Sequence, residues 1–149
     1  MVNQENPPAE AKFVDLMKRV RRLGLGALNS EDGAASPAQM ALIDWVALHP
    51  GCGVQEIADG LNLAPPTISV SVKKMEQNGI IARKNHPSDA RSVQFFLTLQ
   101  GQKLYDGNQS YQRKKVQRLL SGLTPQEQET LTALLERALL SAENRSSNG

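Results

Sequence analysis

The sequence contains very few cysteine, histidine and aromatic residues. Its 149 residues include one cysteine and two histidines, and aromatic residues make up only 4%. A single cysteine excludes an internal disulfide and a zinc site built from several thiolates. Two histidines are too few for a histidine-rich metal centre. With so few aromatic rings, leucine, valine, isoleucine and alanine must build the hydrophobic core.

Long hydrophobic runs are missing as well. No run approaches the ~20 apolar residues that a membrane span needs, and residues 1–10 lack the basic and apolar regions of a signal peptide. We therefore expect a cytoplasmic protein with no membrane partner. The length fits one domain, and 40% hydrophobic with 21% charged residues is a globular composition.

The patterns that indicate an enzyme are also missing from the sequence. There is no Ser/His/Asp or Cys/His arrangement, no pattern of paired carboxylates and no glycine-rich phosphate loop. No cluster of residues has metal-ligand spacing. We therefore expect no enzyme activity, no catalytic or metal-binding residues, and no cofactor.

The net charge is only +2, but the charges are unevenly distributed. Residues 12–22 hold five basic residues and one acidic residue, residues 73–91 hold five and two, and residues 103–118 hold five and one. In residues 124–143 the balance reverses to one basic and four acidic residues. Separated basic clusters suit a polyanion such as nucleic acid. For residues 12–22 and 113–118, we favour a solvated helix face.

Hydrophobic periodicity and turn residues predict a mainly α-helical chain with one small β-hairpin. Ser36-Pro37-Ala38-Gln39 and Thr124-Pro125-Gln126-Glu127 have the sequence of helix-capping boxes. Gly53 and Pro65 mark the starts of two shorter helices. The predicted elements are helices at 10–30, 37–48, 54–61, 65–78, 98–120 and 124–143, strands at 80–84 and 93–97 around a polar loop at 85–92, and frayed or disordered ends at 1–9 and 144–149.

Two of the predicted helices form a helix-turn-helix, because the connection at residues 62–64 is tight. Apolar residues at helical spacing should hold the pair together: Ile57, Leu61, Ile68, Val72 and Met75. On the other face of the second helix, small hydroxyl groups suit base edges, Val70 suits a thymine methyl group, and lysines suit phosphates. The outward residues are Pro66, Thr67, Ser69, Val70, Ser71, Lys73 and Lys74.

The predicted hairpin adds basic side chains on the same side as this helix. These are Arg83, Lys84, His86 and Arg91. An arginine at a hairpin tip fits a narrow, electronegative minor groove. Asp89 lies two residues before Arg91, and we expect an ion pair that holds the guanidinium extended. Without a further partner, such a surface pair contributes at most ~1 kcal/mol.

Five short segments are informative through their order and spacing: Ser36–Gln39, Glu56–Leu61, Pro65–Ser69, Met75–Arg83 and Asp89–Gly101. The last reads Asp-Ala-Arg-Ser-Val-Gln-Phe-Phe-Leu-Thr-Leu-Gln-Gly, which is an Asp-x-Arg, an apolar strand and a Leu-Thr-x-x-Gly without a gap. From about residue 10 to 143, the chain resembles the MarR-type winged-helix regulators of bacteria, the multiple antibiotic resistance regulators.

The resemblance implies a homodimer that binds a pseudo-palindromic operator in double-stranded DNA. It also implies a repressor, released by a small and often phenolic or anionic effector. The recognition helix, about residues 65–78, would enter the major groove, and the wing at 85–92 the minor groove. The DNA-binding positions that match the family motif are Pro65, Pro66, Thr67, Ser69, Asp89 and Arg91.

The implied organisation is a single domain over residues 1–149. Residues 36–99 would form a winged helix-turn-helix lobe. The dimerisation region would be entirely helical and built from the N-terminal helix and the last two helices, at residues 10–30 and 100–143. A winged-helix adaptor that binds proteins, without specific DNA binding, is the alternative function.

Two residues depart from the family pattern. Val70 stands where members often carry an arginine, so we expect base preference to rest on thymine contacts, phosphates and shape rather than on guanine. Ala64 stands where a polar helix cap is usual, and we expect a cost of ~1 kcal/mol from the missing cap.

The family's effector cavity begins near Trp45, and we expect its lining to include Met17, Met40, Ile43 and Trp45. Oxidant-sensing members place a cysteine near the start of the first helix, where this chain has none. We expect Cys52 to be a buried, inert thiol. The alternative, redox sensing, would need exposure and a lowered pKa.

Overall fold

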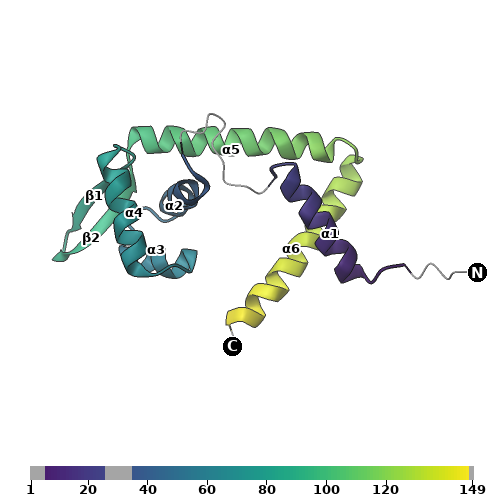
Figure 1. Ribbon diagram of the computed structural model, residues 1–149, viewed down its shortest axis with the longest axis horizontal. Helices are drawn as coiled ribbons and strands as arrows, with labels where there is room; N and C mark the ends of the chain where they lie inside the picture. Colours follow the sequence, from purple (N-terminus) through teal and green to yellow (C-terminus); the bar gives the residue numbers. More distant parts are fainter. Residues whose placement is uncertain (1–5, 26–34, 148–149) are drawn as a thin grey trace, which may run out of the picture. The chain divides into compact units, whose positions relative to one another are not determined.

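The computed structural model describes residues 6–25 and 35–147 (Figure 1). Residues 1–5, 26–30 and 148–149, which belong to predicted ends and to the first predicted helix, lie outside the described residues. The predicted fold class, mainly α-helical with one antiparallel hairpin, is confirmed. The elements are α1 (Ala9–Arg22), α2 (Pro37–Leu48), α3 (Val54–Leu61), α4 (Pro65–Gln77), β1 (Ile81–His86), β2 (Asp89–Leu97), α5 (Leu99–Leu120) and α6 (Pro125–Ser147).

The chain divides into two compact units, one up to Gln112 and one from Arg113 on. In the second unit, α6 continues through Ser147, although the sequence predicts its end at Glu143. The hydroxyls of Ser146 and Ser147 donate to the carbonyls of Ala142 and Glu143 at 3.2 and 3.1 Å. Residues 144–147 are therefore helical rather than disordered.

In the first unit, α1 is shorter than the sequence predicts. The helix ends at Arg22, and Gly24 adopts a φ of +71°. A left-handed residue is incompatible with a continuing α-helix, and glycine adopts this conformation without a steric penalty. Gly24 thus ends the helix earlier than the apolar pattern predicts.

Both predicted capping boxes are confirmed. Ser36 Oγ accepts from the Gln39 N–H at 3.2 Å, and the Ser36 N–H donates to Gln39 Oε1 at 2.9 Å. Thr124 and Glu127 make the same reciprocal pair at the start of α6. Hydrogen bonds from the Thr124 backbone, and then from its side chain, lower the pKa of the Glu127 carboxyl.

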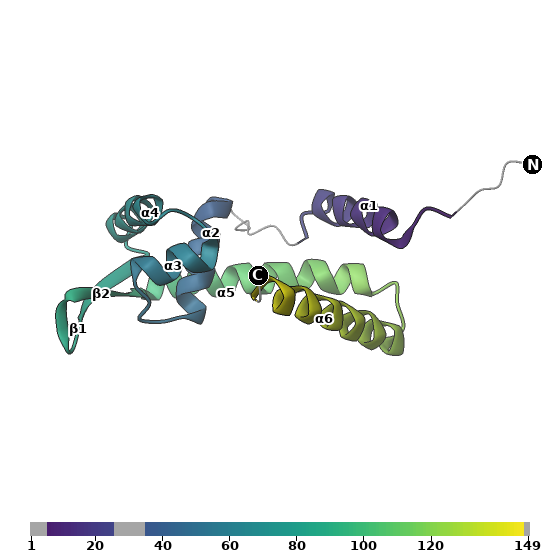
Figure 2. The same ribbon diagram turned by 90° about the horizontal axis from the view of Figure 1, so that it is seen from below.

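Helices α2, α3 and α4 and the hairpin gather around one core beside the N-terminal half of α5 (Figures 1 and 2). The predicted inner residues Ile57, Ile68, Val72 and Met75 are all buried, and Leu61 packs against the core while partly exposed. Phe95 of β2 is also buried in this core, and Leu104 and Tyr105 of α5 pack against the core. These contacts pack α2, α3, α4, the hairpin and the start of α5 together.

Thr98 fastens the end of the hairpin to the start of α5. Its hydroxyl donates to the Gly79 carbonyl at 2.6 Å and lies 3.1 Å from the Ile80 carbonyl, while it accepts the Gly101 N–H at 3.1 Å. A Cβ on Gly101 would lie only 2.3 Å from the Ile80 carbonyl oxygen. The Leu-Thr-x-x-Gly motif therefore provides a helix cap and a close backbone approach at one junction.

Candidate nucleic-acid interface

Helix α4 presents one polar face to solvent. A tight turn precedes it, in which Asn62 adopts the left-handed conformation and the Leu63 N–H donates to the Ala58 carbonyl at 2.9 Å. Because Ile68, Val72 and Met75 are buried, the opposite face must point outward. The exposed residues on α4 include Pro65, Pro66, Thr67, Ser69, Val70, Lys73 and Lys74, whereas Ser71 is half-buried.

The first turn of α4 has no side-chain cap at Ala64, as the sequence predicts. The predicted cost of ~1 kcal/mol does not follow, however, because a cap accepts from the second or third helical N–H. Pro65 and Pro66 have no N–H. The next donor, the Thr67 N–H, already bonds to the Ala64 carbonyl at 3.0 Å. Pro66 thus removes one of the two donors that a polar cap would serve, and the Ala64 carbonyl accepts from the other.

The tip of the hairpin is tighter than the predicted loop at 85–92. Strand β1 extends to His86 and β2 begins at Asp89, which leaves a two-residue connection. The Ser88 N–H donates to His86 Nδ1 at 3.2 Å, and the pairing shifts register at Asn85/His86. At the tip, side-chain acceptors replace some of the backbone hydrogen bonds between β1 and β2. The alternation of apolar residues in the sequence does not predict this replacement. Because His86 Nδ1 accepts this bond, its Nε2 carries the proton and is free to donate.

Asp89 shapes the backbone instead of pairing with the Arg91 guanidinium. Its Oδ1 accepts the Arg91 N–H at 3.0 Å, and its Oδ2 lies 3.5 Å from the Ser92 hydroxyl. The expected Asp89–Arg91 ion pair is not among the contacts of the described residues. The two-residue spacing favours this local side-chain-to-backbone bond. Arg91 is exposed at the hairpin tip.

The remaining basic residues of the hairpin pack on neighbouring groups. Lys84 Nζ lies 5.2 Å from the centre of the Phe96 ring. The Arg83 guanidinium lies 5.6 Å from the Phe95 ring centre and makes two hydrogen bonds to the Glu76 carboxylate, at 2.9 and 3.2 Å. Sequence reasoning missed Glu76 as part of this surface. The sequence pattern that could have predicted this pair is an acidic residue in the last turn of a helix, followed by a glycine turn and then an arginine.

The predicted effector residues are only partly brought together. Met40 and Ile43 are fully buried in the core, and Trp45 packs against that core while partly exposed. Met17 lies on α1, is 39% exposed and does not belong to this cluster. Among the described residues, Trp45 Nε1 and Asn108 Oδ1 are buried side-chain atoms without a hydrogen-bond partner.

Cys52 is 2% exposed, in the loop before α3. Its backbone pairs with Phe95, which ties this loop to β2. Burial, followed by the charge of Glu56, raises the pKa of the Cys52 thiol from 9.0 to about 11. Both observations favour the inert thiol over a redox sensor.

We expect Cys52 to react with a disulfide reagent about 100-fold more slowly in the folded protein than in urea at pH 8, since its thiolate fraction falls by that factor. The raised pKa also stabilises the fold below pH 9, and this contribution is lost as the pH rises toward 11. Absorbance kinetics with Ellman's reagent measure the ratio. Equal rates in the two states would revive the redox hypothesis.

Within the described ranges, no helix is both long and apolar enough to cross a membrane. In the same residues, no group of three or more His, Cys, Asp and Glu side chains is arranged to hold a metal ion.

Known proteins are similar to this chain in sequence or in fold. YkoM of Bacillus subtilis, an uncharacterized HTH-type transcriptional regulator, is 29% identical over 110 residues, or 74% of this chain and 71% of YkoM. MdtR of Bacillus subtilis, an HTH-type transcriptional repressor, is 27% identical over 97 residues, or 65% of this chain and 63% of MdtR. Streptococcus pneumoniae FabT, crystallised in complex with DNA, matches the fold with a TM-score of 0.74 at 19% identity, over 91% of this chain and 95% of FabT.

The sequence model of the MarR family matches residues 35–93. That segment contains α2, α3, α4, β1 and most of β2, in the order and packing described above. It includes the tight turn at Asn62, the exposed face of α4 and the Asp89–Arg91 tip. Over residues 35–93, the chain therefore matches the MarR family in sequence.

Proposed function

We propose that this chain is a DNA-binding transcriptional regulator, a repressor that acts on DNA in the cytoplasm. Its recognition helix α4 enters the major groove, and the tip of the hairpin enters the adjacent minor groove. One observation carries the proposal: the exposed polar face of α4 lies on the same packed lobe as a basic hairpin, and α4 contacts β1 directly. The repressor MdtR and the DNA complex of FabT lend support by similarity.

The contacts divide by chemistry. Thr67, Ser69 and the half-buried Ser71 can meet donors or acceptors on base edges. Val70, 71% exposed in the middle of α4, offers a methyl surface to thymine. Phosphates are left to Lys73, Lys74 and Lys84. Pro65 and Pro66 approach the DNA backbone closely. At the tip of the hairpin, the residues that enter the minor groove are His86, Asp89 and Arg91.

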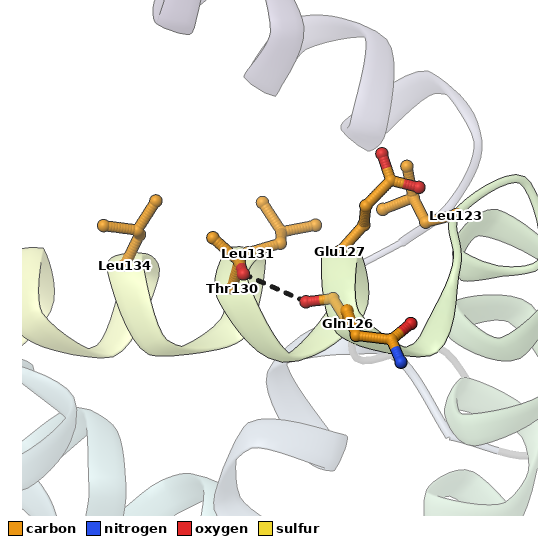
Figure 3. A pocket seen from close by; sticks show the side chains of 6 residues that line it. All are labelled: Leu123, Gln126, Glu127, Thr130, Leu131 and Leu134. Carbon is orange, nitrogen blue, oxygen red and sulfur yellow. Dashed lines mark hydrogen bonds between the residues drawn. The ribbon is translucent and has the colours of Figure 1, made fainter.

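A second copy of the chain is the proposed partner for the exposed apolar residues of α1 and α6. Among the described residues of these two helices, none is buried. On α6, Leu131 and Leu134 project to the same side as Leu123 and Glu127 and line a shallow apolar groove (Figure 3). Exposed apolar faces of this extent are typical of interfaces. In a homodimer, two recognition helices ~34–36 Å apart would read a pseudo-palindromic operator.

We also propose a small phenolic or anionic effector that relieves repression. Support comes from the unpartnered Nε1 of Trp45, a buried donor that an anion or a hydroxyl oxygen would satisfy. Met40 and Ile43 are sealed in the core, so Trp45 and Met17 are the predicted effector residues that retain exposed surface. Such an effector would bind more tightly to a conformation of the dimer whose two lobes have a spacing that does not fit the operator, and would thereby shift the population away from the DNA-binding conformation.

The test is a mobility shift with the DNA upstream of the protein's own gene, over a salt series, and with duplexes selected from a random library. A specific regulator retains its complex against competitor DNA, and log K falls with log salt by ~0.9 per phosphate neutralised. The stoichiometry should be two chains per duplex. Failure to select any duplex would overturn the proposal.

Arg91→Ala should weaken binding to the selected duplex by about tenfold or more and reduce the salt slope by ~0.9. Folding stability should be unchanged, because among the described residues the Arg91 side chain makes no hydrogen bond or ion pair. Arg137→Ala is the matched control, since it removes an equal charge from exposed α6. Equal affinity for wild type and Arg91→Ala would favour the protein adaptor.

A further inference from the structure

Glu76 and Arg83 connect the recognition helix to the hairpin. Glu76 lies in the last turn of α4, and Arg83 is the third residue of β1. The Arg83 guanidinium binds both carboxylate oxygens, with Nη2–Oε1 at 2.9 Å and Nε–Oε2 at 3.2 Å. Two-point contacts of this kind fix orientation as well as distance.

The backbone between the two residues is also held. Gly79 turns the chain with a φ of +73°, and the Ile80 N–H donates to the Met75 carbonyl at 2.9 Å. Phe95 supports the other side of the guanidinium, with its ring centre 5.6 Å away. Arg83 is therefore bound from the helix and from the facing strand at once, and its side chain is already engaged before DNA arrives.

The pair contributes little to folding. The side chains are 51% and 24% exposed, and ion pairs open to solvent are weak contributors to stability. The position of the pair is more informative than its strength. It joins the last turn of α4 to β1, the two elements that are proposed to contact DNA.

Resting on the proposed function, we propose that Arg83 is a positioning residue: paired with Glu76, it sets the recognition helix and the hairpin at the angle that DNA requires. This changes the role expected from the sequence, in which Arg83 contacts DNA itself. Lys84 and Arg91 supply the cationic contacts of the hairpin, while the Arg83 charge is matched by Glu76.

A DNA-contacting role and a positioning role of Arg83 predict opposite effects of one substitution on DNA affinity. If Arg83 contacted phosphate, Glu76 would compete with DNA for it, and Glu76→Ala would strengthen binding and raise the salt slope by ~0.9. If the pair positions the two elements, Glu76→Ala weakens binding although it removes a negative charge from the interface. Simple electrostatics cannot produce that loss.

The experiment compares Glu76→Ala with Glu56→Ala, which removes an equal charge from the exposed face of α3 in the same lobe. The probes are a duplex selected by the wild-type protein and a scrambled duplex of equal composition. We expect Glu76→Ala to lose about fivefold or more in affinity for the selected duplex, because preorganisation is lost. Binding to the scrambled duplex, the salt slope and the melting temperature should change little.

A second comparison uses the double variant Glu76→Ala/Arg83→Ala. Since the pair acts as one unit, the double variant should bind the selected duplex about as weakly as Glu76→Ala alone. Unchanged or tighter binding by Glu76→Ala, or clearly weaker binding by the double variant than by Glu76→Ala, would overturn the positioning role while leaving the proposed function intact. If the wild-type protein selects no duplex, the proposed function and this inference fail together.

Discussion

Replacing Gly101 by alanine is expected to destabilise the protein by about 3 kcal/mol, near the upper end of the usual overpacking cost. The new Cβ would lie 2.3 Å from the Ile80 carbonyl oxygen. This neighbour is backbone, and it also accepts the Thr98 N–H at 3.0 Å. Relief of the clash must therefore move the start of α5 away from the turn that precedes β1, and the hydrogen bonds of Thr98 are disrupted. Urea unfolding followed by circular dichroism measures the loss.

Gly107→Ala provides a control in the same helix. No atom lies within 4 Å of a Cβ built at Gly107, so alanine meets no obstacle there. Because alanine is the better helix former, we expect a gain of about 0.5–1 kcal/mol. The same substitution should thus have opposite effects at two positions six residues apart. A loss at Gly107 as large as the loss at Gly101 would show that the loss at Gly101 does not come from the contact with the Ile80 carbonyl.

Gly60→Ala is expected to displace the Trp45 ring and to cost about 1–3 kcal/mol. A Cβ at residue 60 would lie 2.1–2.5 Å from three carbons of the indole. The ring stacks on His49 with centroids 4.0 Å apart, so a displaced ring loses this contact. Trp45 is the only tryptophan in the chain. Its fluorescence should shift to longer wavelength, since the displaced indole meets more water.

A shorter side chain at residue 45 should relieve the clash with a Cβ at residue 60. In a Trp45→Leu background, Gly60→Ala should cost clearly less than in the wild-type background, because the indole carbons are absent. Equal costs in both backgrounds, measured by urea unfolding, would mean that the ring is not the obstacle.

The elements that the sequence predicts well are those with local signals. The Ser36 and Thr124 capping boxes use side chains three residues apart, so a short stretch of sequence contains both partners. The apolar face of α4 repeats with helical spacing and is buried as predicted. Gly79 adopts the positive φ expected of a glycine that ends a helix.

The features that the sequence did not reveal depend on competition between partners. Asp89 could bond to the Arg91 guanidinium or to the Arg91 N–H, and the backbone bond forms. Arg83 could extend into solvent or bind Glu76, and it binds Glu76 because the Gly79 turn brings the two together. Residue types and spacing do not rank such alternatives, since the outcome depends on the bend of the chain.

The paired prolines at the start of α4 have a consequence for conformational entropy. Both rings fix φ near −65°, so the first turn of the helix has little freedom to lose when it is immobilised. Lys73 and Lys74, in the second half of the same helix, have long side chains with many rotamers. Helix α4 is therefore stiff at one end and adaptable at the other. In the proposed complex, the rigid end can match the shape of the DNA groove, while the flexible end adjusts to the positions of the phosphates.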